Sequence, residues 1–152
     1  MEHEVSQTGW GSKLGRPLGI VVLFFLLGPP IGALAFSTIG ALGALVMGQS
    51  GTTAAMIFHG AIVGIVFSWF VGGFQAFIAG AAMAIFELVT RRQSLAVPMI
   101  AGLVAGIPYM IEEDLGGGLS TLLLIIHLVA SLGCGLLVKA TWKPMPPVPA
   151  SV

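Results

Sequence analysis

Charged residues are scarce in this sequence. Among its 152 residues, 6 are Lys or Arg and 6 are Asp or Glu, so that charged residues make up 8% of the chain, whereas about 25% is usual for a soluble domain. The net charge is zero, and no excess of basic residues indicates a nucleic-acid partner. Because charged side chains are costly in lipid, this composition predicts a chain embedded in a membrane.

Cysteine is also rare, and the motifs of common enzyme sites are missing. Cys134 is the single cysteine, which excludes an intrachain disulfide framework and a metal site with several cysteines. The 3 histidines do not recur at a metal-ligand spacing. The sequence contains no Gly-rich phosphate loop, nucleophile elbow or HExxH motif. We therefore expect a protein that is not an enzyme and that holds no cofactor or metal ion.

Apolar residues dominate instead. Hydrophobic residues make up 57% of the chain, and the mean hydropathy is +1.04. The apolar residues form four continuous runs, at residues 18–47, 54–90, 95–111 and 119–138, and a helical membrane crossing needs about 20 such residues. We expect an all-α, polytopic transmembrane helical bundle of about four crossings at residues 18–138, with an N-terminal tail at 1–17 and a proline-rich tail at 139–152.

Two of the runs contain predicted breaks. In Gly28-Pro29-Pro30 the prolines lack N–H groups, so that the carbonyls of Phe25 and Leu26 lose their helical donors. The second break is Gly72-Gly73, inside residues 54–90. As one straight helix this run would be about 55 Å long, whereas the hydrocarbon core is about 30 Å thick. The run therefore crosses once with a bend or a re-entrant start, or it crosses twice.

The basic residues favour a single crossing. If each run crosses once, all six Lys and Arg residues lie on one side and the acidic loop lies on the other. Basic residues near helix ends favour the cytoplasm, which predicts four crossings and two cytoplasmic termini. Five crossings with the N-terminus outside is the alternative. A signal peptide ending at Ala33-Leu34-Ala35 is a further alternative, but the apolar character continues to Met47, which favours a retained helix.

A polar stripe is predicted on the last run. Ser120, His127, Ser131 and Cys134 are spaced so that they share one sector of a helix otherwise made of apolar residues. Polar groups inside a membrane usually face the interior of the helix bundle. The stripe therefore predicts hydrogen bonds between helices, or else a proton relay or a ligand contact.

Two further groups of charged residues are candidates. Glu87 precedes Arg91 by one helical turn, which predicts an ion pair at the membrane boundary or a carboxylate that handles protons or cations. Glu112, Glu113 and Asp114 are adjacent, and they predict a solvated loop or a weak site for a divalent cation or a partner.

Small residues recur along the second run. Gly73, Ala76, Gly80, Ala84 and Glu87 follow one another at spacings of three and four. Such a face lets helices approach closely in lipid. It predicts helix packing within the chain, contact with a second copy or a membrane-protein partner, or a path for a substrate.

The segments "LGPPIGA" and "FVGGFQAFIAGAAMA" resemble small bacterial inner-membrane proteins of about four helices. The resemblance implies a location in the inner membrane and no activity. We expect a non-enzymatic structural or accessory subunit whose partners include the lipid bilayer. The alternative is a small transporter or channel that uses the two breaks as its sites, because interrupted helices often form transport sites.

Overall fold

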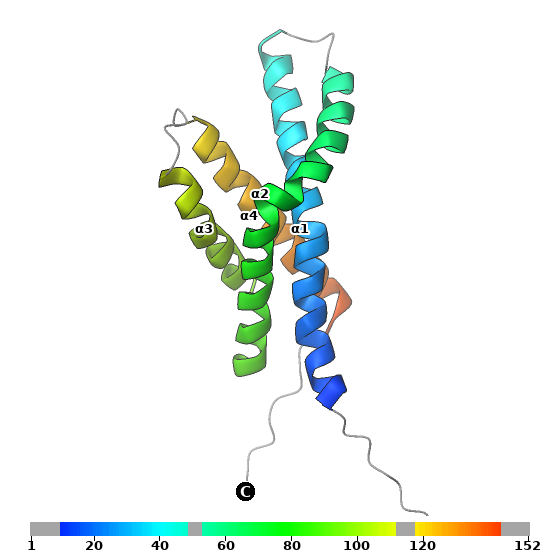
Figure 1. Ribbon diagram of the computed structural model, residues 1–152, viewed down its shortest axis with the longest axis vertical. Helices are drawn as coiled ribbons and strands as arrows, with labels where there is room; N and C mark the ends of the chain where they lie inside the picture. The colour runs from blue at the N-terminus through cyan, green and yellow to red at the C-terminus, as the bar shows by residue number, and fades with distance from the viewer. Residues whose placement is uncertain (1–9, 49–52, 112–117, 144–152) are drawn as a thin grey trace, which may run out of the picture.

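The computed structural model describes residues 10–48, 53–111 and 118–143, and these residues form four α-helices and no strand (Figure 1). The predicted all-α fold is therefore confirmed. The helices are α1, Trp10–Val46; α2, Thr53–Thr90; α3, Ala96–Ile111; and α4, Gly118–Thr141. Helix α1 begins at Trp10 and not at residue 18, because an apolar run marks the part of a helix that suits lipid and does not mark where the helix starts.

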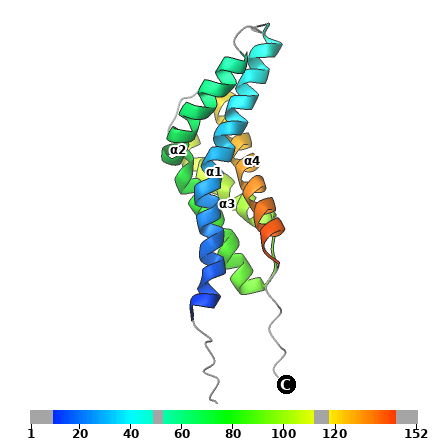
Figure 2. The ribbon, with the colours of Figure 1, turned by 90° about the vertical axis from the view of Figure 1, so that its right-hand side faces the viewer.

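Both predicted breaks lie inside continuous helices. Residues 28–30 and 72–73 are helical, and so are the residues on either side of them. Figure 2 shows α1 bending along its length, and Figure 1 shows a sharper bend near the middle of α2. Residues 53–90 thus form one bent helix, and neither a re-entrant segment nor a turn between two crossings is present in them.

Three helices are long and apolar enough to cross a membrane, which indicates an integral membrane protein. These stretches are Gly15–Val46, His59–Thr90 and Thr121–Thr141. A shorter apolar stretch, Ala96–Pro108, lies in α3. The 16 residues of α3 correspond to about 24 Å of helix, less than the hydrocarbon thickness of about 30 Å.

The helices form two antiparallel pairs that meet at one end. Helices α1 and α2 run side by side, and their upper halves extend beyond α3 and α4, which lean away from them (Figure 1). The start of α1, the end of α2, the start of α3 and the end of α4 lie at the same end of the molecule (Figure 2). We call this the basic end, because its residues include Arg16, Arg91, Arg92, Lys139 and Lys143.

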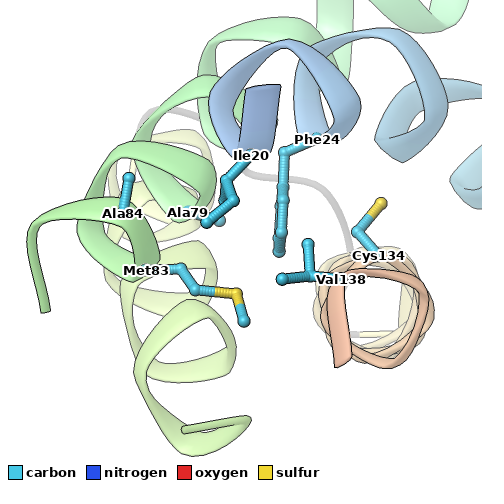
Figure 3. Close-up of a cluster of buried hydrophobic side chains, with 7 residues drawn as sticks. All are labelled: Ile20, Phe24, Ala79, Met83, Ala84, Cys134 and Val138. Atoms are coloured by element: carbon cyan, nitrogen blue, oxygen red, sulfur yellow. The ribbon is translucent and has the colours of Figure 1, made fainter. Parts of the chain in front are cut away.

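The buried core lies toward the basic end. Ile20 and Phe24 from α1 meet residues of α2 and α4, and the ring of Phe24 points toward Val138 (Figure 3). The α2 and α4 members are Ala79, Met83, Ala84, Cys134 and Val138. The two helix pairs are therefore joined through side-chain packing in this half of the bundle.

The small-residue face of α2 packs against α1, as the packing interpretation predicts. At Gly80, an added Cβ would lie 2.8 Å from Cβ of Phe24 and 3.2 Å from the backbone Cα of Val21. An added Cβ at Gly28 would lie 2.9 Å from Cβ of Ala76. The separations of 2.8 Å at Gly80 and 2.9 Å at Gly28 are too short for real carbon contacts, so the close approach of α1 and α2 requires glycine at these two positions.

This packing predicts that Gly80→Ala destabilises the protein. Overpacking against a backbone atom costs about 1–3 kcal/mol, and the gain in helix propensity of about 1 kcal/mol offsets only part of that cost. Gly43→Ala is the matched control, because an added Cβ at this exposed glycine meets nothing within 4 Å. Thermal unfolding in detergent should give a lower midpoint for Gly80→Ala only, and equal midpoints would contradict the packing.

Candidate functional site: an intramembrane cavity between the helix pairs

A hydrogen bond from α2 compensates for the proline in α1. Pro29 has no N–H group to donate to the carbonyl of Phe25. The indole Nε1 of Trp69 donates to this carbonyl oxygen at 3.1 Å. In a bilayer, where no water can replace the lost donor, a side chain from a neighbouring helix is one of the few groups that can satisfy such a carbonyl. The proline-containing part of α1 is thereby joined to α2 one turn before Gly72-Gly73.

The two glycines at the bend of α2 have different surroundings. An added Cβ at Gly73 would touch Cε2 of Phe25 at 3.5 Å, whereas an added Cβ at Gly72 would meet nothing within 4 Å. Gly73 therefore packs against α1, and Gly72 borders open space.

That open space is a cavity with a volume of about 260 Å³. Its walls come from residues 24–36 of α1, 64–76 of α2 and 123–131 of α4, with Gly102 of α3. Gly28, Pro29 and Gly72 are among the lining residues, so that the two predicted breaks border the same space. Most of the wall is glycine, alanine and large apolar side chains, but Ser68, Gln75, His127 and Ser131 are polar.

Gln75 differs from the other polar residues of the wall. Its side chain is 3% exposed, and its Oε1 has no hydrogen-bond partner among the described residues. The hydroxyl of Ser68, in contrast, donates to the carbonyl of Ile65 at 2.7 Å. A buried acceptor without a partner costs about 1–3 kcal/mol, so a buried amide of this kind calls for an explanation.

Three of the four residues of the predicted polar stripe have described side chains, and these border the cavity or the core. His127 and Ser131 line the cavity, and Ser131 packs so closely on α3 that a Cβ at Gly102 would lie 2.6 Å from its Oγ. Cys134 is completely buried and belongs to the core. Ser120 lies in α4, and the structure does not describe its side chain. The stripe thus divides between the cavity and the core.

Glu87 has an ion-pair partner on another helix. Nη2 of Arg16 lies 2.6 Å from Oε1 of Glu87, whose side chain is 1% exposed. Nη1 of Arg16 also donates to the backbone carbonyl of Lys143, and Gln93 donates to the carbonyl of Trp142 at 3.0 Å. These contacts tie α1, α2 and the end of α4 together at the basic end.

The other charged candidates have separate outcomes. The backbone N–H of Arg91 donates to the carbonyl of Glu87 at 2.9 Å, and the predicted side-chain ion pair between these two residues stays a prediction. The acidic residues Glu112, Glu113 and Asp114 lie outside the described residues. In the described part of the chain, no group of three or more His, Cys, Asp or Glu residues could hold a metal ion.

Sequence reasoning missed Gln75, Trp69 and Arg16 as members of this arrangement. For Gln75 a signal was present, because it is the one side-chain amide within the four apolar runs. For Arg16 and Trp69 no local signal exists, because their partners are 71 and 44 positions away in the sequence.

Comparisons with known proteins add no relative. A scan against protein-family models, a search of curated proteins and a search of solved structures each found no match. The chemistry of the cavity is therefore inferred from its own residues. A mainly apolar wall with a few hydrogen-bonding groups is the usual character of a small-molecule binding site.

A double-mutant cycle tests whether Arg16 is the ion-pair partner of Glu87. Glu87→Gln leaves Arg16 without its buried counter-charge, and we expect unfolding in detergent to become easier by about 1–3 kcal/mol. Arg16→Gln should give a similar loss, and the double variant should lose less than the sum of the two single variants.

Arg91→Gln is the matched comparison for this test. If Arg91 were the principal partner of Glu87, Arg91→Gln would couple to Glu87→Gln in the same double-mutant cycle, and Arg16→Gln would not. That result would contradict the ion pair described here.

Proposed function

We propose that this protein is a non-enzymatic membrane protein that binds a lipid-soluble small molecule inside the bilayer. The observation that carries the proposal is the cavity bordered by Gly28, Pro29 and Gly72, with the buried and unpartnered Gln75 in its wall. The cavity lies between helices of a bundle, which is a common place for ligand sites. A ligand at this depth would come from the surrounding lipid, because the walls are mainly apolar.

The packing around the cavity supports a binding site over a packing defect. The cavity opens to the outside of the bundle, because Phe36, Phe67 and Val71 in its wall are 45%, 60% and 51% exposed. Here the bends that border the cavity are held by the hydrogen bond between Trp69 and Phe25, and its α3–α4 wall by the close contact between Gly102 and Ser131. The space is therefore built by specific contacts.

This proposal agrees with the sequence-based expectation of a structural or accessory protein, since binding requires no catalytic group. A small transporter is the second candidate, and the position of both bends at one cavity favours it. A transporter requires in addition a second conformation in which the core at the basic end opens. In the structure that core is packed, with Ile20, Phe24, Met83 and Val138 each less than 2% exposed.

We further propose that the basic end faces the cytoplasm of a bacterial cell and that the protein lies in the inner membrane. The gathering of five basic residues at one end of the bundle supports this orientation. The resemblance of its sequence to small bacterial inner-membrane proteins supports the location.

Reporter fusions test the orientation. Alkaline phosphatase, which is active only outside the cytoplasm, should be active when it is fused after Gly117 and inactive when it is fused after Gln93 or Val152. The fusion after Gln93 is the decisive one, because it follows α2 directly. Activity there would contradict either the orientation or the single crossing of α2, and the fusion after Gly117 would show which of the two is wrong.

Photolabelling tests the binding site. An octanol carrying a diazirine should label Ile126 and His127 on α4 in phosphatidylcholine vesicles, and excess unmodified octanol should remove this labelling. Gly72→Leu should abolish the labelling that excess octanol displaces, because the side chain of the introduced leucine would fill the open space of the cavity next to residue 72. Gly43→Leu, also without a close neighbour but away from the cavity, should behave as the wild type.

Labelling that octanol cannot displace, or labelling that Gly72→Leu leaves unchanged, would show contact with bulk lipid and would refute a binding site in this cavity.

A further inference from the structure

We infer that the ligand of the cavity is an uncharged, lipid-soluble molecule that carries a hydroxyl group, and that this hydroxyl donates a hydrogen bond to Oε1 of Gln75. The inference rests on the proposed function and names the chemical class that the cavity selects. A lipid alcohol and a free long-chain or aromatic alcohol share this chemistry.

The requirement for a donor comes from Gln75. The amide oxygen has less than 1 Å² of accessible surface and accepts no hydrogen bond from the described residues. Gln75 is one of the residues that line the cavity, so that a donor bound there reaches this oxygen after a small rotation of the side chain. A carbonyl oxygen can only accept, so the group that satisfies it has to be an O–H or N–H. A bound molecule with such a group would remove the cost of the unpartnered acceptor.

The absence of charge comes from the rest of the wall. Among the described residues that line the cavity, none is Asp, Glu, Lys or Arg. The buried ion pair of Glu87 and Arg16 does not line the cavity and lies near the basic end. A charged ligand would therefore lose its hydration without gaining a counter-charge, which is strongly unfavourable in an apolar site.

A hydroxyl suits the wall better than an ammonium or a carboxylate for the same reason. The hydroxyl is neutral, it donates one hydrogen bond, and its oxygen can accept another. His127 lines the same cavity, and a neutral imidazole has one nitrogen that can donate to such an oxygen. The apolar body of the ligand would then contact the glycines, alanines and aromatic rings of the wall.

The experiment compares two photoreactive probes on the full-length protein in phosphatidylcholine vesicles. One is the diazirine-bearing octanol, and the other is its methyl ether, which has the same chain but no donor. On the wild type, we expect half-maximal displaceable labelling at a probe concentration about threefold to tenfold lower for the octanol than for the ether. This range corresponds to the free energy of one hydrogen bond.

Variants of residues in the cavity wall identify the group that accepts the hydrogen bond from the ligand hydroxyl. Gln75→Met keeps a similar side-chain length without the acceptor, and we expect it to remove the preference for octanol over the ether. Its melting temperature should not fall, because the wild-type acceptor has no partner to lose. Thr38→Val is the matched control, since the hydroxyl of Thr38 donates to the carbonyl of Leu34 and Thr38 does not line the cavity, and it should keep the preference.

The outcomes separate this inference from the proposed function. If both probes label the wild type equally and Gly72→Leu blocks both, the cavity binds ligands but selects no donor, and the inference is wrong. If Gln75→Met keeps the preference, Gln75 is not the acceptor and the inference is also wrong. If neither probe gives displaceable labelling, the proposed binding site itself fails. Because the probe comparison uses the wild type, it remains decisive even if Gln75→Met does not fold.

Discussion

The hydrogen bond from the indole of Trp69 to the carbonyl of Phe25 is the contact on which the shape of this bundle depends. Pro29 removes the helical donor of that carbonyl, and lipid offers no replacement. Because the donor comes from α2, this carbonyl is satisfied only while α2 lies beside it. The bend of α2 at Gly72-Gly73 follows within one turn, so the two deformed helices hold one another in place. The cavity lies at the junction of these bends.

The two halves of the bundle then differ in how closely their helices approach. Toward the basic end, glycines and alanines of α2 allow α1 to pack directly on it, and Phe24 fills the space between α1, α2 and α4. Beyond the bends, α1 and α2 continue together while α4 and α3 lean away (Figure 1). The same glycine-rich composition thus produces close contact where a side chain of the neighbouring helix faces the glycine, as Phe24 faces Gly80 and Ala76 faces Gly28. It produces open space at Gly72, where none does.

Much of this fold could be predicted from hydropathy and from the rules for small residues in lipid. The four apolar runs became four helices, and the small-residue face of α2 became a packing face. What could not be predicted are the partners over long sequence distances. The i+4 rule selects Arg91 for Glu87, but an ion pair with Arg16 requires that α1 and α2 lie antiparallel at a known offset. Gln75 was visible as a rare amide, yet only the structure shows that its oxygen is buried without a partner.

The short helix α3 has a consequence for the surrounding lipid. Its 16 residues stand beside α1 and α2, which have 37 and 38 residues. Acyl chains next to α3 therefore meet an apolar surface that is shorter than the hydrocarbon thickness of the bilayer. Acyl chains next to the α1–α2 pair meet an apolar surface that is longer than this thickness. A bilayer adapts to such a mismatch by thinning or thickening locally, at a cost of fractions of a kcal/mol per Å. In a bilayer, an α3 embedded beside α1 and α2 would therefore give the surrounding lipid an uneven thickness and would favour shorter or more disordered acyl chains on the side of α3.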